Sequence, residues 1–281
     1  MALEPFRERF ADRFVNVGVA EQNMIGIATG LAESGFIPFV YSIATFASLR
    51  AFEFIRNGPV LHNLPVRIVG VGMGFEYGHA GPTHHAVEDV SVMRTLPGLA
   101  IVIPADSAQT SNAVRQTHAV PGPVYYSLGK DDHIRVPGLN GNFELGKLQV
   151  IRSGGSVAIV AMGSVSQEAA AAAEELDRQG VRASVAILSN FSPDPERDLV
   201  ALLSRVRQAI TVEAQTVSGG LGAFVASAIA SNGLTCRLQM LAVRTSPDGS
   251  SGSNTNRWRK YGLDRTSIVA TVLASTCAAE Q

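Results

Sequence analysis

Short apolar runs alternate with amphipathic stretches along most of this sequence, and this alternation limits the folds that are open to it. In the first half, apolar runs occupy residues 36–41, 66–72, 99–104 and 122–128, and helical periodicity occupies residues around 21–34, 46–57, 84–95 and 106–118. The pattern is typical of parallel strands that are joined by crossover helices. We therefore expect an α/β fold.

A second alternating set follows in the second half of the chain. Its apolar runs lie at 156–163, 182–189, 208–214 and 237–243, with helical stretches at 165–179, near 197–206 and after 222. The segment at about 131–154 is rich in Gly, Pro and Asn and has no sustained helical period. We predict two consecutive α/β domains with largely parallel sheets, at residues 1–130 and 155–281, joined by a linker at 131–154.

The composition supports two domains and excludes several kinds of partner. A chain of 281 residues that is 46% hydrophobic can form two cores. Lys and Arg number 23 against 24 for Asp and Glu, so no basic surface indicates nucleic acid or an anionic membrane. The sequence has no run of about 18 apolar residues and no basic-then-apolar leader. We expect a cytoplasmic protein that acts on small molecules.

Three successive strand-to-helix junctions carry residues that are capable of chemistry. Glu21 follows the run RFVNVG, Phe46 follows the run at 36–41, and His84 follows the run at 66–72. Ligands of α/β sheets bind beyond the carboxyl ends of the strands, so these side chains are candidates for one site. Each also has a structural explanation: a first-turn acid favoured by the helix dipole, a core aromatic residue, and a loop histidine.

The loop at 72–85, GMGFEYGHAGPTHH, is the most unusual segment. It contains four glycines, a proline and three histidines in 14 residues. Ordering so many glycines costs conformational entropy. The composition of the loop therefore indicates that its backbone approaches another group closely.

Several segments together resemble the carboxy-terminal half of transketolases, in particular the split kind in which two subunits share the enzyme. The resemblance is carried by NVGVAEQNMIGIATGLAESGFIPF (16–39), RAFEFIRN (50–57), GPTHHAVEDVSVMRTLPGLAIVIPADS (81–107), VYYSLGK (124–130), VEAQTVSGGLG (212–222) and YGLD (261–264). It implies a pyrimidine-binding domain, here without its usual first strand and helix, followed by a transketolase carboxy-terminal domain.

The resemblance also implies a cofactor. Members of this family use thiamine diphosphate, whose aminopyrimidine ring is activated by a carboxylate, and Glu21 aligns with that catalytic glutamate. Phe46 aligns with the aromatic residue that stacks on the ring. The resemblance further assigns Ile43 and Arg50 to the cofactor pocket, with Ile43 in place of a usual aromatic residue. Because burial favours the protonated form of an acid, we expect Glu21 to share a proton with the ring.

On the substrate side, the resemblance assigns His84 to the sugar hydroxyls and to acid–base catalysis. Sugar-using relatives read close to GEDGPTH, whereas this chain reads GHAGPTH. Ala80 thus replaces an aspartate that recognises the donor hydroxyl, and His79 replaces the adjacent glutamate. Gly72 replaces a phosphate-binding histidine, and Lys130 stands where an anion-binding arginine is usual. The lost acid predicts an altered choice of donor.

The diphosphate and its metal imply a second subunit. The family binds them through a GDG motif followed by an asparagine, and no such motif occurs in these 281 residues. The resemblance therefore implies a separate partner that carries this motif and binds Mg²⁺ or another divalent metal. We expect two copies of each subunit, with the cofactor held across their interface, and no metal ligand in this chain.

These observations predict one subunit of a thiamine-diphosphate-dependent transferase that is active only with its partner. Its reaction moves a two-carbon ketol or acyl unit from a ketose or a keto acid such as pyruvate to an aldehyde or ketone. Two alternatives stay open: the beta subunit of a keto-acid dehydrogenase-like decarboxylating complex, and a non-catalytic partner subunit. The turn SGGLG (218–222) before a predicted helix either binds an anion or is only a tight connection.

Overall fold

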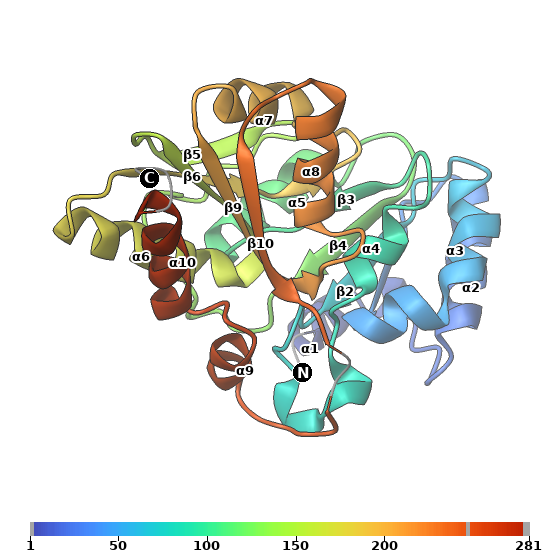
Figure 1. Cartoon of the computed structure of the whole chain (residues 1–281). Coiled ribbons are helices and arrows are strands. Elements are labelled where there is room, and N and C mark those ends of the chain that lie inside the picture. The colour runs from blue at the N-terminus through green and yellow to red at the C-terminus, as the bar shows by residue number, and fades with distance from the viewer. Residues whose placement is uncertain (1–2, 246–247, 278–281) are drawn as a thin grey trace.

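The fold consists of two mostly parallel sheets in sequence, as a computed structural model that describes residues 3–245 and 248–277 shows (Figure 1). Within these residues, the first sheet has the strand order β1 (Phe39–Ile43), β2 (Arg67–Val71), β4 (Val124–Leu128), β3 (Ala100–Val102) and β8 (Asn190–Phe191). The second has the order β10 (Arg237–Val243), β9 (Gln208–Thr216), β6 (Val157–Met162), β7 (Ala183–Leu188) and β5 (Leu148–Arg152). The predicted pair of α/β domains is confirmed.

The strands lie where the apolar runs are because most of them are covered on both faces. Every residue of β6 and β7 is buried, as expected for central parallel strands between two helical layers. Among the strands of the described residues, only β8 and β5 run antiparallel to their neighbours, β3 and β7. Both are edge strands, where an antiparallel addition is common in mixed sheets.

The helices of the described residues surround the two sheets, except that α1 (Glu4–Arg9) buries none of its residues. In the first half they are α1, α2 (Glu21–Glu33), α3 (Phe52–Ile55), α4 (Asp89–Met93) and α5 (Ser107–Thr117). In the second half they are α6 (Ser166–Arg178), α7 (Glu196–Leu203), α8 (Leu221–Ser231), α9 (Asn254–Lys260) and α10 (Arg265–Cys277). Figure 1 shows α2 and α3 at one end of the molecule and α6 with α10 at the other. No helix of the described residues is long and apolar enough to cross a membrane.

Two helices begin or continue differently from the periodicity in the sequence. The stretch predicted as one helix at 46–57 is a π-helical turn (Phe46–Arg50), then α3, then a second π-helical stretch (Arg56–Val60). The helix predicted from residue 84 begins only at Asp89, because residues 82–84 form a separate short turn that starts with Pro82.

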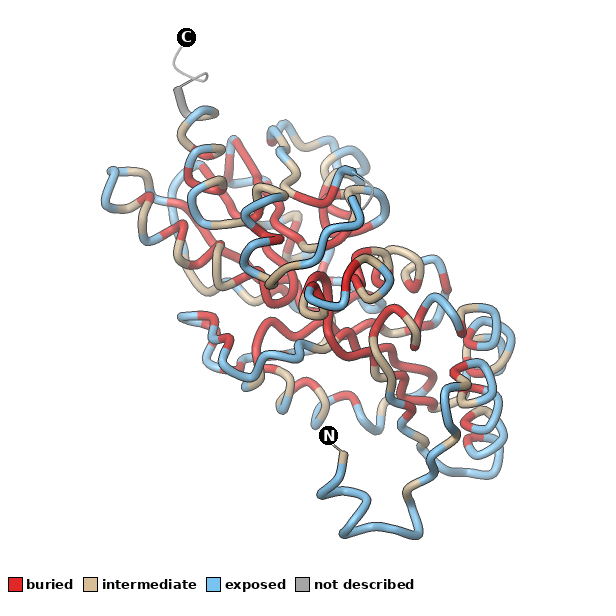
Figure 2. The backbone as a smooth tube through the Cα atoms, turned by 90° about the horizontal axis from the view of Figure 1, so that it is seen from below, coloured by how far each residue is buried: buried red, intermediate tan, exposed pale blue. Residues whose placement is uncertain are grey.

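The two domains are joined by more than the predicted linker. Strand β5 lies within residues 131–154 and pairs with β7, so this segment contributes to the second sheet. Strand β8 follows β7 in the chain but pairs with β3 of the first sheet. One buried apolar cluster includes Ile25 and Ile68 from the first domain and Leu188 and Phe224 from the second. The domains therefore share a core, whereas the amino-terminal segment runs outside it (Figure 2).

Candidate active site

The candidate site lies at the carboxyl ends of strands β1, β2 and β4, which are neighbours in the first sheet. Because these strands are parallel, the segments that follow them meet at one edge. The structure brings Glu21, Arg50, Phe46 and His84 into one series of contacts there.

Glu21 begins α2, and only 6% of the residue is exposed. Ser42 Oγ donates a hydrogen bond to Oε1 at 3.0 Å, and Arg50 Nη1 donates one to Oε2 at 2.7 Å. Burial acts to raise the pKa of Glu21, but the hydrogen bonds from Arg50 and Ser42 outweigh it and lower the pKa. We expected burial to favour the protonated form of Glu21. That expectation is wrong while Glu21 is paired with Arg50, because the lowered pKa leaves the carboxylate ionised at neutral pH.

Arg50 binds Phe46 as well as Glu21. Phe46 and Arg50 are the first and last residues of the π-helical turn at 46–50, in which residues four positions apart lie on the same side. The guanidinium carbon of Arg50 is 4.3 Å from the centroid of the Phe46 ring. Single π-helical turns often occur at functional sites. Here the turn places one planar cation against both an aromatic face and a buried acid.

His84 lies next to Phe46. The centroids of the two rings are 5.2 Å apart and the rings meet edge to face. The Thr83 hydroxyl is 2.9 Å from His84 Nδ1, which leaves Nε2 as the ring nitrogen without a described protein partner. A histidine held through one nitrogen can exchange a proton through the other.

Two residues of the glycine-rich loop, Glu76 and Tyr77, were missed by the sequence reasoning, and both contact the predicted Lys130. The Tyr77 ring lies 6.4 Å from the His84 ring, and the Lys130 ammonium lies 4.5 Å from the Tyr77 centroid. The Glu76 carboxylate accepts hydrogen bonds from the backbone N–H groups of Lys130 and Asp131. The aromatic and acidic residues inside the glycine-rich loop were the available signal, because such a loop must pack against its own side chains.

Two predicted residues are not placed by the described contacts. His79 is exposed on the turn Gly78–Ala80, and no described contact joins it to His84 or Glu21. Ile43 ends β1, but the residue of β1 that contacts Glu21 is Ser42. Successive strand residues point to opposite faces, so Ile43 points away from the side on which Ser42 meets Glu21. The cofactor role of Ile43 and the substrate role of His79 stay predictions.

The second domain supports the loop at 72–85. Gly74 pairs with Ala86 across the base of the loop, and Gly74 has no room for a side chain because it lies against Ala214 of β9. Gln215, the next residue of β9, donates to the Ala86 carbonyl at 2.9 Å and to the buried Asp89 carboxylate at 2.8 Å. The glycines of this loop thus allow the close approach of backbone that their number predicted.

The SGGLG turn binds a side chain of the same polypeptide, the carboxyl group of Glu213. The Glu213 carboxylate accepts hydrogen bonds from the backbone N–H groups of Leu221 and Gly222, both at 2.7 Å, at the start of α8. A side chain at Gly220 would overlap this carboxylate. Burial raises the pKa of Glu213 to about 7. Glu213 therefore occupies the backbone N–H groups at the start of α8 that could otherwise bind an external anion.

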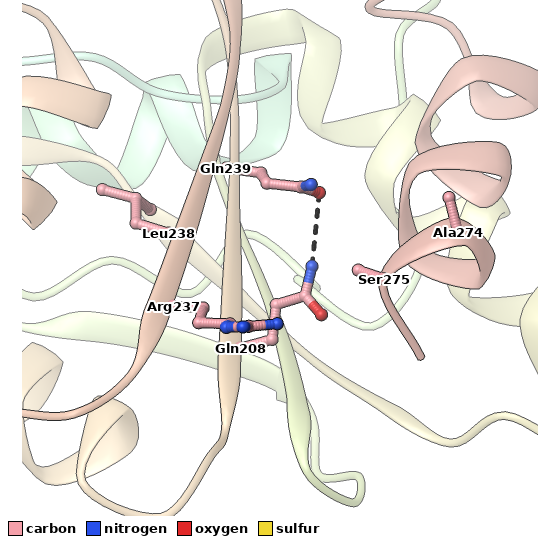
Figure 3. A pocket seen from close by; sticks show the side chains of 6 residues that line it. All are labelled: Gln208, Arg237, Leu238, Gln239, Ala274 and Ser275. Atoms are coloured by element: carbon pink, nitrogen blue, oxygen red, sulfur yellow. Dashed lines mark hydrogen bonds between the residues drawn. The ribbon is translucent and has the colours of Figure 1, made fainter. Parts of the chain in front are cut away.

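Two other features lie apart from these contacts. A hollow of about 410 Å³ is lined by residues of β9, β10 and α10, among them Gln208, Arg237 and Ser275, and none of the candidate residues reaches it (Figure 3).

Among the described residues, Asp131, Asp132 and His133 form an exposed group whose ligand atoms lie within 4.8 Å of one another. Exposed acidic groups are common without an ion, and we assign none to it.

Comparisons with known proteins agree with this architecture. Residues 2–133 match the family described as transketolase, pyrimidine binding domain, and residues 146–268 match the family described as transketolase, C-terminal domain. A putative transketolase C-terminal section from Methanocaldococcus jannaschii is 36% identical over 270 residues, which are 95% of this chain and 84% of that protein.

Two further relatives are described as parts of divided enzymes. A 6-deoxy-6-sulfo-D-fructose transketolase subunit from a Clostridium species is 38% identical over 82% of this chain and 72% of its own length. The solved structure of a split gene transketolase, described as an inactive beta4 tetramer, superposes with a TM-score of 0.83 at 34% identity, over 96% of this chain and 85% of that one.

Proposed function

Because the chain belongs to the transketolase family as one subunit of a transketolase-like transferase, we propose that it contributes the pyrimidine-binding half of a thiamine diphosphate site. A separate partner subunit, carrying a GDG motif followed by an asparagine, binds the diphosphate and a divalent metal such as Mg²⁺. Two copies of each subunit form the active enzyme. The single observation that carries this proposal is the buried Glu21 carboxylate, which Arg50 joins to the Phe46 ring.

The donor set at Glu21 fits an aminopyrimidine. The Arg50 guanidinium is planar, carries N–H donors, lies against the Phe46 face and hydrogen-bonds to Glu21. A protonated or imino pyrimidine offers the same features: a flat ring to stack and an N–H for the acid. We infer that Phe46 and Glu21 would hold the ring and that Arg50 is the group it displaces.

The residues of this chain would then divide the work. Thiamine diphosphate, when bound, supplies a nucleophilic carbanion that accepts the two-carbon unit. Glu21 holds a proton at the ring nitrogen, and Ser42 keeps that carboxylate oriented. His84 exchanges a proton through Nε2 with a substrate hydroxyl. Phe46 contacts both His84 and Arg50, the residue that binds Glu21, so cofactor and substrate would both adjoin the Phe46 ring.

An exposed apolar surface supports the partner. Within the described residues, every exposed large apolar side chain except Val150 lies in the first 61 residues. We define the amino-terminal apolar surface by these side chains: Phe6, Phe10, Val15, Val19, Ile27, Leu31, Phe36, Ile37, Phe39, Tyr41, Leu49, Phe54 and Leu61. A surface of this kind marks a protein interface. Two of its members, Ile27 and Leu31, lie on α2, the helix that Glu21 begins, so a partner that covers them would also cover the helix of the cofactor site.

The donor is proposed to be an anionic ketose. The Clostridium relative is described as acting on 6-deoxy-6-sulfo-D-fructose, a ketose with a negative charge at its far end. Lys130 supplies a cation on the His84 side of the site. A keto acid such as pyruvate is the alternative donor, because Ala80 replaces the acid that recognises a donor hydroxyl in sugar-using relatives.

The test is reconstitution with the partner subunit from the same genome. With thiamine diphosphate and Mg²⁺, we expect the complex to transfer a ketol unit from a sulfonated or phosphorylated ketose to an aldehyde, without release of carbon dioxide. Glu21→Gln should lower kcat by about 100-fold or more, the range of acid–base contributions. Glu33→Gln, which changes an exposed acid on the same helix, is the matched control and should leave kcat unchanged.

Carbon dioxide release from pyruvate at a rate above the ketose reaction would contradict ketol transfer and favour the decarboxylating alternative. Full turnover in the Glu21→Gln complex would show that the chain is a non-catalytic subunit.

A further inference from the structure

Tyr77 occupies a position that only a glycine at residue 72 allows. Gly72 follows β2 with a φ of +85°, and a Cβ atom added there would overlap the Cδ2 and Cε2 atoms of the Tyr77 ring. The ring therefore lies on the backbone at the carboxyl end of a central strand. Ligands of α/β sheets bind at this edge, so the Tyr77 ring lies where a ligand of the site would approach.

Tyr77 lies close to both residues of this chain that we assign to the substrate, His84 and Lys130. The centroid of the ring is 6.4 Å from that of the His84 ring and 4.5 Å from the Lys130 ammonium. Lys130 is exposed and its backbone N–H is bound by Glu76, which precedes Tyr77. Residues 76 and 77 thus hold the backbone and the side chain of the same lysine.

We propose that Tyr77 is a specificity-determining residue, whose ring closes the wall between His84 and Lys130 and holds the Lys130 ammonium toward the anionic end of the donor. A cation over an aromatic face is attracted by the ring quadrupole and loses side-chain freedom. The preorganised ammonium then binds a sulfonate or phosphate with less ordering cost. This inference rests on the proposed function and adds the residue that selects charged over neutral ketoses.

The first experiment compares Tyr77→Ala and Tyr77→Phe in the reconstituted complex. Tyr77→Ala should raise KM for the sulfonated or phosphorylated ketose by about three- to tenfold, the range expected for one cation–π contact, with little change in kcat. With erythrulose, a neutral ketose, KM should change less than twofold. Tyr77→Phe keeps the ring and should behave like the wild type with both donors.

The second experiment uses the glycine beneath the ring. Gly72→Ala must displace Tyr77 and should reproduce the KM increase of Tyr77→Ala. Gly98→Ala is the matched control, because Gly98 has the same φ of +85° but no neighbouring atom within 4 Å of an added Cβ. Both alanines carry the same backbone strain, so a difference between them reports the displaced ring.

Equal KM changes for charged and neutral ketoses in Tyr77→Ala, or equal effects of Gly72→Ala and Gly98→Ala, would overturn the inference. A wild-type complex that is inactive with every ketose would overturn the proposed function instead. In that case binding of inorganic phosphate to the isolated chain, followed by NMR, decides between the two outcomes for Tyr77. Weaker binding in Tyr77→Ala than in Tyr77→Phe supports the inference, and equal binding overturns it.

Discussion

Two groups compete for the Glu21 carboxylate: the Arg50 guanidinium that binds it in the structure and the cofactor ring that we propose binds it in the enzyme. The Arg50 side chain is 42% exposed, so water screens the ion pair and its net contribution to stability is small. A weak pair is suited to exchange. Arg50 can keep the buried acid paired in the isolated subunit and yield it to a ligand that stacks on the same ring.

Replacing Arg50 should therefore change the acidity of Glu21. In Arg50→Met the pKa of Glu21 should rise, because burial persists while the largest stabilising hydrogen bond is lost. NMR titration of the side-chain carboxyl carbon in the isolated chain measures this directly. Arg56→Met is the control, because the Arg56 side chain hydrogen-bonds to Asn57 and has no described contact with Glu21. An unchanged Glu21 pKa in Arg50→Met would contradict the assigned ion pair.

Glu213 predicts a pH dependence of stability. Its pKa is about 7 in the folded chain against 4.5 for an ordinary glutamate, so the folded state keeps the proton that the unfolded state releases. Stability should fall as pH rises from about 4.5 to about 7 and level off above, by a total of about 3 kcal/mol. Urea unfolding across pH 4.5–8 should show this slope in the wild type. In Glu213→Gln the slope should be reduced, and an equal slope would contradict the assignment.

Helix α2 shows how one element serves both a core and an interface. Ile25, Ala28 and Ala32 are buried, whereas Ile27 and Leu31 are exposed one turn apart on the opposite side. The helix thus carries apolar side chains on two sides, and the chain buries only one of them. The buried side packs against the core of this chain, and the exposed side is free to pack against another subunit.

The exposed side of α2 should be needed for assembly and not for folding. Leu31→Asp should weaken association with the partner by at least about tenfold, because it places a charge in an apolar interface. Sedimentation velocity of the mixed subunits measures this. Val150→Asp, on β5 and outside the amino-terminal apolar surface, is the matched control and should associate normally. Equal association of both variants with the partner would place the interface elsewhere.

Helices and strands with many buried residues could be predicted from the sequence. Very short strands, and strands whose partner lies far away in the sequence, could not. β6 and α6 match their predicted bounds within two residues, because a run of buried apolar positions leaves one periodicity. The two residues of β8 have no periodicity, and their partner β3 is in another domain. At the site, His84 follows β2 as predicted, whereas the run RFVNVG before Glu21 forms no strand in the structure, so that Glu21 was identified by its place at the start of a helix and by the resemblance. Tyr77 was missed because its position depends on the missing side chain of Gly72.

At the scale of the molecule, the two domains behave as one packing unit. Asp89 of the first domain is fully buried and accepts hydrogen bonds from Tyr125 at 2.7 Å, Ser127 at 2.8 Å and Gln215 at 2.8 Å. Gln215 belongs to the second domain. Since burial raises the pKa of Asp89, each of these donors matters for holding the carboxyl group inside the protein.

Removing the donor from the second domain should lower the stability of both. Gln215→Leu should cost about 1–3 kcal/mol, because the Ala86 carbonyl and Asp89 lose a buried partner. Fluorescence of Trp258, the single tryptophan, reports the second domain, and hydrogen exchange of β2 reports the first. Both should shift together to lower denaturant. Gln239→Leu, on the exposed edge strand β10, is the control, and a shift confined to Trp258 would contradict the shared unit.

Strand β8 has a consequence for how such an enzyme can be divided. Its two residues leave the second sheet to extend the first, so that Phe191 pairs with Ile101 across the domain boundary. A polypeptide cut between residues 130 and 148 would strip the pyrimidine domain of its outermost strand and uncover the shared interior. Dividing the chain between its two domains is therefore expected to cost stability, because the two halves share a strand pairing and a buried cluster.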